Sequence, residues 1–286
     1  MLTGRADIAS MKISVITATR DLSDVEALQR VWGSLEAQDL PDGWEFEWLL
    51  QVDGPLDYDA LSVLNNTRAL AGSTGRAGGA GAARNAALVR ATGEWVCICD
   101  DDDTLPAGSL RRRIEALREH PSAVWVGGLV EQRDESGTHV LARQTTRSGL
   151  FTPHEALAEL DGNSCFPILP MTLLARVDAV YAVGGWGAMP VGEDNILMSG
   201  LVALFPGVVL FEPLYCYQRR EGSLTTSPLS LEVIATHRAW QLRRHLCSHE
   251  MLGARTLAPP HSVVVEPPGH RCSSICPKPC PHLRDG

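Results

Sequence analysis

Residues 82–105, AARNAALVRATGEWVCICDDDDTL, contain the stretch that decides the fold. Small residues at 82–91 predict a helix, which ends at Gly93, and the apolar residues 95–99 (WVCIC) predict a buried strand. Four consecutive aspartates, from Asp100 to Asp103, follow this strand directly. A buried strand that ends in charged residues is typical of an α/β sheet, where ligands bind at the carboxyl ends of the strands.

The same alternation of strand and helix patterns continues on both sides of this stretch. We expect further strands at residues 13–17, 46–52, 123–130 and 208–211. Helical patterns cover residues 25–38, 58–70, 109–119, 194–204 and 231–252, and the glycine-rich residues 72–81 predict a loop. This order favours an α/β fold with a Rossmann-like, mostly parallel central sheet flanked by helices, and a less regular second half.

The composition excludes several classes of protein. The chain has 286 residues with a net charge of −9, which disfavours nonspecific binding to nucleic acid or to anionic membranes. No segment is long and apolar enough to span a bilayer, and the first ten residues lack the apolar core of a secretory signal. Because five of the eight cysteines are scattered, they are interpreted as reduced thiols of a cytoplasmic protein.

The four aspartates predict a metal site. Neighbouring carboxylates repel one another unless a cation neutralises them, and Mg²⁺ or Mn²⁺ typically binds one or two carboxylates together with water and substrate phosphate. A solvated acidic turn, with Asp103 capping the next helix, is the alternative.

A second acidic pair, Glu193 and Asp194, opens a predicted helix after the turn formed by Gly184, Gly185 and Trp186. It is either functional or a helix cap favoured by the helix dipole. Cationic partners for a phosphate are available at Arg84, Arg219 and Arg220, although each alone is compatible with a surface arginine. The glycine-rich loop lacks the GK[ST] sequence of a Walker phosphate loop.

In this order, the motifs resemble those of the family 2 glycosyltransferases of GT-A fold, from about residue 12 to residue 226. The resemblance is carried by six segments, ISVITATRD (13–21), SLEAQDLP (34–41), LLQVDGP (49–55), ARNAALVRATGEWVCICDDDD (83–103), GGWGAMPVGEDNILMSGL (184–201) and YQRREGSLT (217–225). It implies an inverting, metal-dependent hexosyltransferase. Such an enzyme moves a sugar from a nucleoside diphosphate sugar, here a UDP-sugar, to the hydroxyl of a saccharide, lipid-linked or small-molecule acceptor.

The resemblance also implies roles for individual residues. Asp53 would accept a hydrogen bond from the base, Asp102 would hold Mn²⁺ or Mg²⁺ on the diphosphate, and Asp194 would deprotonate the acceptor, with Glu193 as its rival. The nucleotide sugar would be bound by Thr17, Ala18, Thr19, Arg20, Arg84, Asp100, Asp101, Arg219 and Arg220. Because the Q-x-x-R-W motif of processive synthases is missing, we expect a single transfer per encounter.

The extent of this resemblance and the composition of the two ends predict the domain boundaries. Residues 1–11 are expected to be a flexible leader, and residues 12–258 one domain with a nucleotide-binding half (12–130) and an acceptor half (131–258). Residues 259–286 are rich in Pro, Cys and His and are interpreted as a tail that is either disordered or a zinc site.

Two other functions fit parts of the sequence. CDDDDT matches the D-x-D-x-T signature of haloacid-dehalogenase-type phosphatases, but these enzymes need a core lysine, and none lies between Lys12 and Lys278. A noncatalytic nucleotide-sugar or metal-binding module is the other alternative, and it would need no catalytic base at Asp194.

Overall fold

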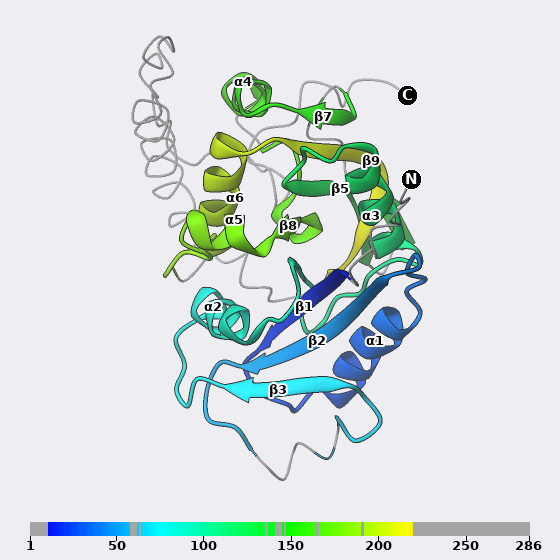
Figure 1. Ribbon diagram of the computed structural model, residues 1–286. Coiled ribbons are helices and arrows are strands. Elements are labelled where there is room, and N and C mark those ends of the chain that lie inside the picture. Colours follow the sequence, from blue (N-terminus) through cyan, green and yellow to red (C-terminus); the bar gives the residue numbers. More distant parts are fainter. Residues whose placement is uncertain are drawn as a thin grey trace, which may run out of the picture.

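Figure 1 shows the computed structural model, which describes residues 11–57, 62, 64–134, 137–140, 145, 147–163, 166–189 and 192–219. Within these residues, nine strands form one sheet in the order β3-β2-β1-β4-β8-β5-β9-β7, with β6 paired to β5. Its first part is parallel and consists of β1 (Met11–Thr19), β2 (Trp44–Val52), β3 (Ala69–Ser73) and β4 (Trp95–Ile98). The predicted α/β architecture is therefore confirmed.

The second part of the sheet is mixed. The long strands β5 (Trp125–Asp134) and β9 (Gly207–Gln218) pair in parallel. The short strand β8 (Leu174–Arg176) joins the two parts, because it lies antiparallel between β4 and β5. The antiparallel strands β6 (Gly137–Val140) and β7 (Gly149–Phe151) pair with β5 and β9, respectively.

Helices cover both faces of the sheet (Figure 1). One apolar core contains buried residues of α1 (Val25–Glu36) and α3 (Ser109–Glu119). The other contains residues of α2 (Ala80–Arg90), α4 (Pro153–Asn163), α5 (Val177–Ala182) and α6 (Glu193–Leu204). Neighbouring residues of β1 belong to different cores, because successive side chains of a strand point to opposite faces.

Helix α1 shows how the sequence pattern produces this packing. The Asp24 carboxylate accepts a hydrogen bond from the backbone amide of Ala27 at 3.0 Å, which caps the first turn. Its apolar face (Ala27, Leu28, Val31, Trp32 and Leu35) is buried, and the ring of Trp32 stacks on Trp48 of β2 with centroids 5.7 Å apart. The predicted helix at residues 25–38 is thus confirmed, two residues shorter at its end.

Two predicted elements differ from the structure. The helix expected at residues 58–70 is wrong in its last part: residues 65–67 form a turn and a bend, and Ala69 begins β3, which pairs in parallel along the edge of β2. The strand expected at residues 208–211 continues to Gln218, because pairing with β5 carries it past Glu212 and Pro213 through two register shifts. Local sequence carries little information about such long-range pairing.

Several expectations fall outside the described residues, namely residues 1–10 of the expected leader, the helix at 231–252 and the tail at 259–286. Met11, the last residue of the expected leader, is instead the first residue of β1. None of the helices in the described part of the chain combines the length and the apolar character needed to cross a bilayer.

Candidate active site

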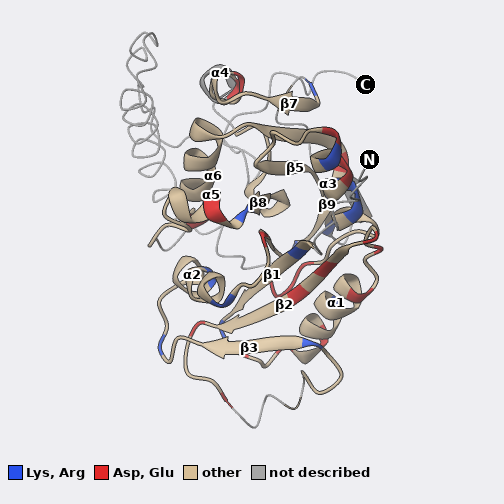
Figure 2. Ribbon diagram, viewed as in Figure 1, with Lys and Arg blue, Asp and Glu red and all other residues tan. Residues whose placement is uncertain are grey.

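The carboxyl ends of β1, β2 and β4 lie together because these strands are parallel neighbours. We call Asp100–Asp103, which follow β4 after Cys99, the acidic loop. Asp100, Asp101 and Asp102 are half-buried, whereas Asp103 is buried with 2% of its surface exposed. The acidic loop and the acidic start of α6 can be followed in Figure 2, where Asp and Glu are red.

Asp103 connects the acidic loop to β9. One of its carboxylate oxygens accepts from the backbone amide of Gln218 at 2.7 Å, and the other accepts from the hydroxyl of Tyr215 at 2.9 Å. Burial, with the charges of Asp100 and Asp102, raises the pKa of Asp103 to about 8. Asp103 does not cap α3, because the residue at the cap of that helix is Gly108 and no side chain caps it.

Arg84 of α2 joins the acidic loop to α6. Its guanidinium, which is buried, donates to the carboxylate of Asp100 at 2.7 Å and forms a second ion pair with Glu193. Burial opposes the charged form, but the carboxylates of Asp100, Glu193 and Asp194 outweigh it and raise the pKa of Arg84. Both terminal nitrogens of Arg84 thus bind carboxylates in this structure, and its contact with a phosphate stays a prediction.

No structural or functional role was predicted for Asn85, the next residue of α2. Its side chain accepts from the backbone amide of Trp186 at 2.9 Å and donates to the Trp186 carbonyl oxygen at 2.8 Å. Gly185 has a φ of 68°, and a Cβ there would lie 2.4 Å from the Asn85 side-chain oxygen, so the turn needs glycine. Asn85 thus holds the Gly-Gly-Trp turn, which leads into α6, against α2.

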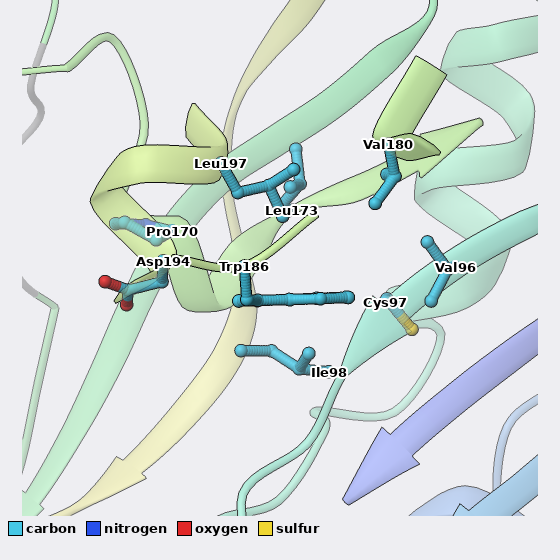
Figure 3. A pocket seen from close by; sticks show the side chains of 9 residues that line it. All are labelled: Val96, Cys97, Ile98, Pro170, Leu173, Val180, Trp186, Asp194 and Leu197. Atoms are coloured by element: carbon cyan, nitrogen blue, oxygen red, sulfur yellow. The ribbon is translucent and has the colours of Figure 1, made fainter. Parts of the chain in front are cut away.

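Asp194 follows Glu193 in the first turn of α6 but has different surroundings. Burial and the charge of Glu193 raise the pKa of Asp194 to about 7, although Arg84 lowers it. Asp194 borders a small void lined mainly by apolar side chains, among them Trp186 and Leu197. Figure 3 shows its carboxylate turned away from the Trp186 ring, so this void belongs to the core and not to a substrate site.

Asp53, which directly follows β2, holds the glycine-rich loop before α2. Its two carboxylate oxygens accept from the backbone amides of Gly78 and Gly79, at 2.7 and 2.9 Å. No side chain of α2 caps its own start. Asp53 therefore accepts the hydrogen bonds of two backbone amides at the start of this helix. Its carboxylate retains further lone pairs for a ligand.

The residues that end β1 separate into two groups. Thr17 is fully buried, where its hydroxyl donates to the Cys99 carbonyl at 2.6 Å and accepts from the Trp48 indole at 2.9 Å. The Thr17 hydroxyl thus has a structural role, and the expected contact of this residue with a nucleotide stays a prediction. Thr19 is also buried, with its hydroxyl on the Asp21 carbonyl, whereas Ala18 is half-buried and Arg20 is exposed.

The late arginines are only partly covered by the structure. Arg219 is exposed next to the end of β9, and its backbone amide donates to the Arg133 carbonyl at 2.9 Å. Arg220 lies outside the described residues.

The acidic loop fits a divalent cation that is shared with a substrate. Across the described residues, no group of three His, Cys, Asp or Glu side chains could by itself hold a metal ion. Mg²⁺ and Mn²⁺ sites on phosphate substrates need only one or two carboxylates. The charges of Asp100 and Asp102 already act on buried Asp103, so a cation bound by Asp100, Asp101 or Asp102 would relieve this repulsion.

Comparisons with known proteins show what the chain and its fold are similar to. Residues 65–179 match the family described as Glycosyl transferase family 2. No curated protein matches the chain. A structure of TarS 1–349 from S. aureus in complex with UDP-GlcNAc is 20% identical, with a TM-score of 0.63, covering 84% of this chain and 73% of that one. Another S. aureus TarS structure is 21% identical, with a TM-score of 0.58, covering 84% of this chain and 43% of that one.

The mannosyltransferase PcManGT from Pyrobaculum calidifontis, in complex with GDP-Man and Mn²⁺, is also similar. It is 16% identical, with a TM-score of 0.52, and the match covers 86% of this chain and 76% of that one. The fold of this chain is therefore the GT-A fold of these glycosyltransferase structures. Residues 65–179 are thus similar to family 2 glycosyltransferases, and this match favours a glycosyltransferase over the phosphatase alternative.

Proposed function

We propose that this chain is an inverting, metal-dependent glycosyltransferase that transfers a sugar from a UDP-sugar to an acceptor hydroxyl, once per encounter. One observation carries the proposal: Arg84 forms ion pairs with both Asp100 and Glu193. Asp100 and Glu193 are 93 residues apart in the chain. The acidic loop and the start of α6 therefore share one site at the edge of the sheet.

The two acidic elements have different tasks in this proposal. Asp102, helped by Asp100 or Asp101, would hold Mn²⁺ or Mg²⁺, which would neutralise the charge that develops on the diphosphate leaving group. Asp194 would take the proton of the acceptor hydroxyl, because a carboxylate with a pKa of about 7 is well matched to that task at neutral pH. Since Arg84 engages Glu193 in an ion pair, we assign the base to Asp194 and a structural role to Glu193.

The nucleotide would lie over the ends of β1 and β2. Asp53 would accept a hydrogen bond from the base, with Ala18 and Arg20 beside it, and Arg219 and Arg220 would approach the diphosphate. Uridine is the proposed base because the TarS structure with the higher TM-score contains UDP-GlcNAc, whereas the PcManGT structure contains GDP-Man.

Thermal unfolding with UDP, GDP and ADP, each with and without Mn²⁺, tests this function. We expect UDP with Mn²⁺ to stabilise the protein most, by about 2.7 kcal/mol when the ligand is present at about 100 times its Kd. The Asp102→Asn variant should keep its fold but lose the part of the stabilisation that depends on Mn²⁺. Asp103→Asn should lose less of it, because the Asp103 carboxylate is directed at β9.

Two results would contradict the proposal. One is that no nucleoside diphosphate stabilises the wild-type protein at any Mn²⁺ concentration. The other is turnover of a generic aryl phosphate, which would restore the phosphatase interpretation.

A further inference from the structure

A buried tyrosine of β9 bridges the two ends of the acidic loop. The hydroxyl oxygen of Tyr215 accepts a hydrogen bond from the backbone amide of Asp100 at 2.9 Å. The same hydroxyl donates to the carboxylate of Asp103, also at 2.9 Å. Tyr215 is fully buried, so water does not compete for either bond.

Further contacts hold β9 along the same loop. Thr104, directly after the acidic loop, exchanges two backbone hydrogen bonds with Cys216, at 3.1 and 2.9 Å. The backbone amide of Gln218 donates to the second carboxylate oxygen of Asp103 at 2.7 Å. The loop is therefore fixed from β9 at Asp100, Asp103 and Thr104, whereas Asp101 and Asp102 lie between these points.

Tyr215 is itself held in place from α3. The carbonyl oxygen of Leu214 accepts from the hydroxyl of Ser109 at 2.6 Å and from the guanidinium of Arg113 at 2.8 Å. Ser109, Arg113 and Leu214 are all fully buried. A tyrosine whose backbone is fixed in this way presents its hydroxyl in one place.

We propose that Tyr215 is a positioning residue that orders the acidic loop for binding of the divalent cation. The inference rests on the proposed function, because it assumes that Asp102 binds the metal with a nucleotide. Neighbouring carboxylates would otherwise repel one another and spread the loop. By fixing both ends of the loop, Tyr215 reduces the ordering that the cation must otherwise impose. Mutation of a residue that hydrogen-bonds to the metal ligands, without binding the metal itself, typically lowers metal affinity or activity by about 10–100-fold.

The Tyr215→Phe variant tests this inference, because it removes the hydroxyl and keeps the ring. Free Mn²⁺ is measured by electron paramagnetic resonance while Mn²⁺ is titrated into protein with UDP or GDP, whichever the wild type binds. We expect Mn²⁺ to bind about 10-fold more weakly. Nucleotide binding without metal should be unchanged, since the hydroxyl is directed at the loop.

Tyr181→Phe is the matched control. Tyr181 lies on α5, is 52% exposed, and donates its hydroxyl to the Leu88 carbonyl at 3.1 Å. This variant also loses one tyrosine hydrogen bond, but not at the acidic loop, so its Mn²⁺ affinity should equal that of the wild type. A second variant, Asp103→Asn, alters the same contact from the loop side. If both residues act through their shared hydrogen bond, the double variant should lose less than the sum of the two single losses.

The outcomes separate this inference from the proposed function. If Tyr215→Phe lowers the melting temperature but leaves Mn²⁺ affinity at the wild-type value, Tyr215 is only structural and the inference is wrong. Additive losses in the double variant would overturn it as well. If the wild type shows neither nucleotide-dependent Mn²⁺ binding nor sugar transfer, the proposed function fails first, and the role of Tyr215 fails with it.

Discussion

Glu193 and Asp194 are adjacent in the sequence, but the structure gives their carboxylates different surroundings. Glu193 is 9% exposed and paired with buried Arg84, so its charge is part of an internal ion-pair network. Asp194 as a whole residue is half-buried, and its carboxylate is turned away from the Trp186 ring (Figure 3). The raised pKa of Asp194 and the orientation of its carboxylate suit the base that we propose.

Substitution of the two residues should therefore have different effects. We expect Asp194→Asn to lower kcat by about 10²–10⁴-fold with little change in donor affinity, because it removes basicity and keeps shape. Glu193→Gln should mainly lower stability, because it leaves the guanidinium of Arg84 with one carboxylate fewer. Steady-state kinetics together with denaturant unfolding of each variant would separate the two roles. Wild-type turnover by Asp194→Asn would contradict the assignment.

The pH dependence of the wild type should report the same group. Since burial and Glu193 raise the pKa of Asp194 to about 7, kcat/KM should rise as the pH increases through 7 and the base loses its proton. The free energy of unfolding should change in the opposite direction and fall as the pH rises. The native state binds this proton more tightly than the unfolded chain, whose Asp has a pKa near 3.8, so the stability due to neutral Asp194 is lost from pH 4 to 7.

Asp194→Asn serves as the control for both pH profiles. Its residual activity should lack the inflection near pH 7, and it should gain stability relative to the wild type as the pH rises from 4 to 7. An inflection that persists in the variant would assign the titration to another group.

At the scale of secondary structure, the sequence predicts the elements whose pattern is local. Helix α3 was predicted with its observed bounds, because its apolar residues recur at helical spacing between Gly108 and Pro121. Strand β3 was missed because ALAGS has little strand character, and only pairing with β2 makes it a strand. The three-residue strand β8 was missed for the same reason, since it exists through its pairing with β4 and β5.

Close packing of α2 against the start of α6 depends on Gly81. A Cβ at this position would lie 2.3 Å from the Gly187 carbonyl oxygen and 3.0 Å from the Cβ of Glu193. Although alanine favours helices, we expect Gly81→Ala to destabilise the protein by about 1–3 kcal/mol, because it separates the two helices. It should also reduce turnover, since Arg84 then pairs less well with Glu193.

Gly33→Ala in α1 is the matched control for this substitution. Apart from its chain neighbours and the backbone of α1, no atom of the described residues lies within 4 Å of a Cβ at Gly33, so the variant should gain about 0.5–1 kcal/mol from helix propensity alone. Denaturant midpoints of both variants check the prediction. Equal stabilisation by the two substitutions would show that α2 and α6 are not held as closely as described.

At the scale of the whole molecule, buried polar contacts join the two parts of the sheet. Arg84 links α2 to α6, and Tyr215 links β9 to the acidic loop. The sequence predicted that Asp53 and the acidic loop follow buried strands, and β2 does end directly before Asp53 and β4 one residue before the acidic loop. It did not predict Asn85, Tyr215 or the structural roles of Thr17 and Arg84, because their partners lie 16 or more residues away in the chain.

Asp53 connects the loop before α2 with the proposed nucleotide site. It orders the loop before α2 through Gly78 and Gly79, and we propose that it also accepts a bond from the base. Asp53→Ala should therefore weaken nucleotide binding by about 1–3 kcal/mol, the usual cost of such a lost contact. The loss should be similar with and without Mn²⁺, because it concerns the base end of the nucleotide and not the diphosphate.

Calorimetry of wild type and variant, with and without Mn²⁺, measures this effect, and Asp42→Ala is the control. Asp42 is exposed just before β2 begins, so the same substitution is made at the opposite end of the same strand. We expect Asp42→Ala to bind nucleotide like the wild type. Asp102→Asn should show the complementary result, a loss that appears only when Mn²⁺ is present. If Asp53→Ala binds nucleotide with unchanged affinity, or weakens it only in the presence of metal, Asp53 does not contact the base and the proposed orientation of the nucleotide along the sheet edge is wrong.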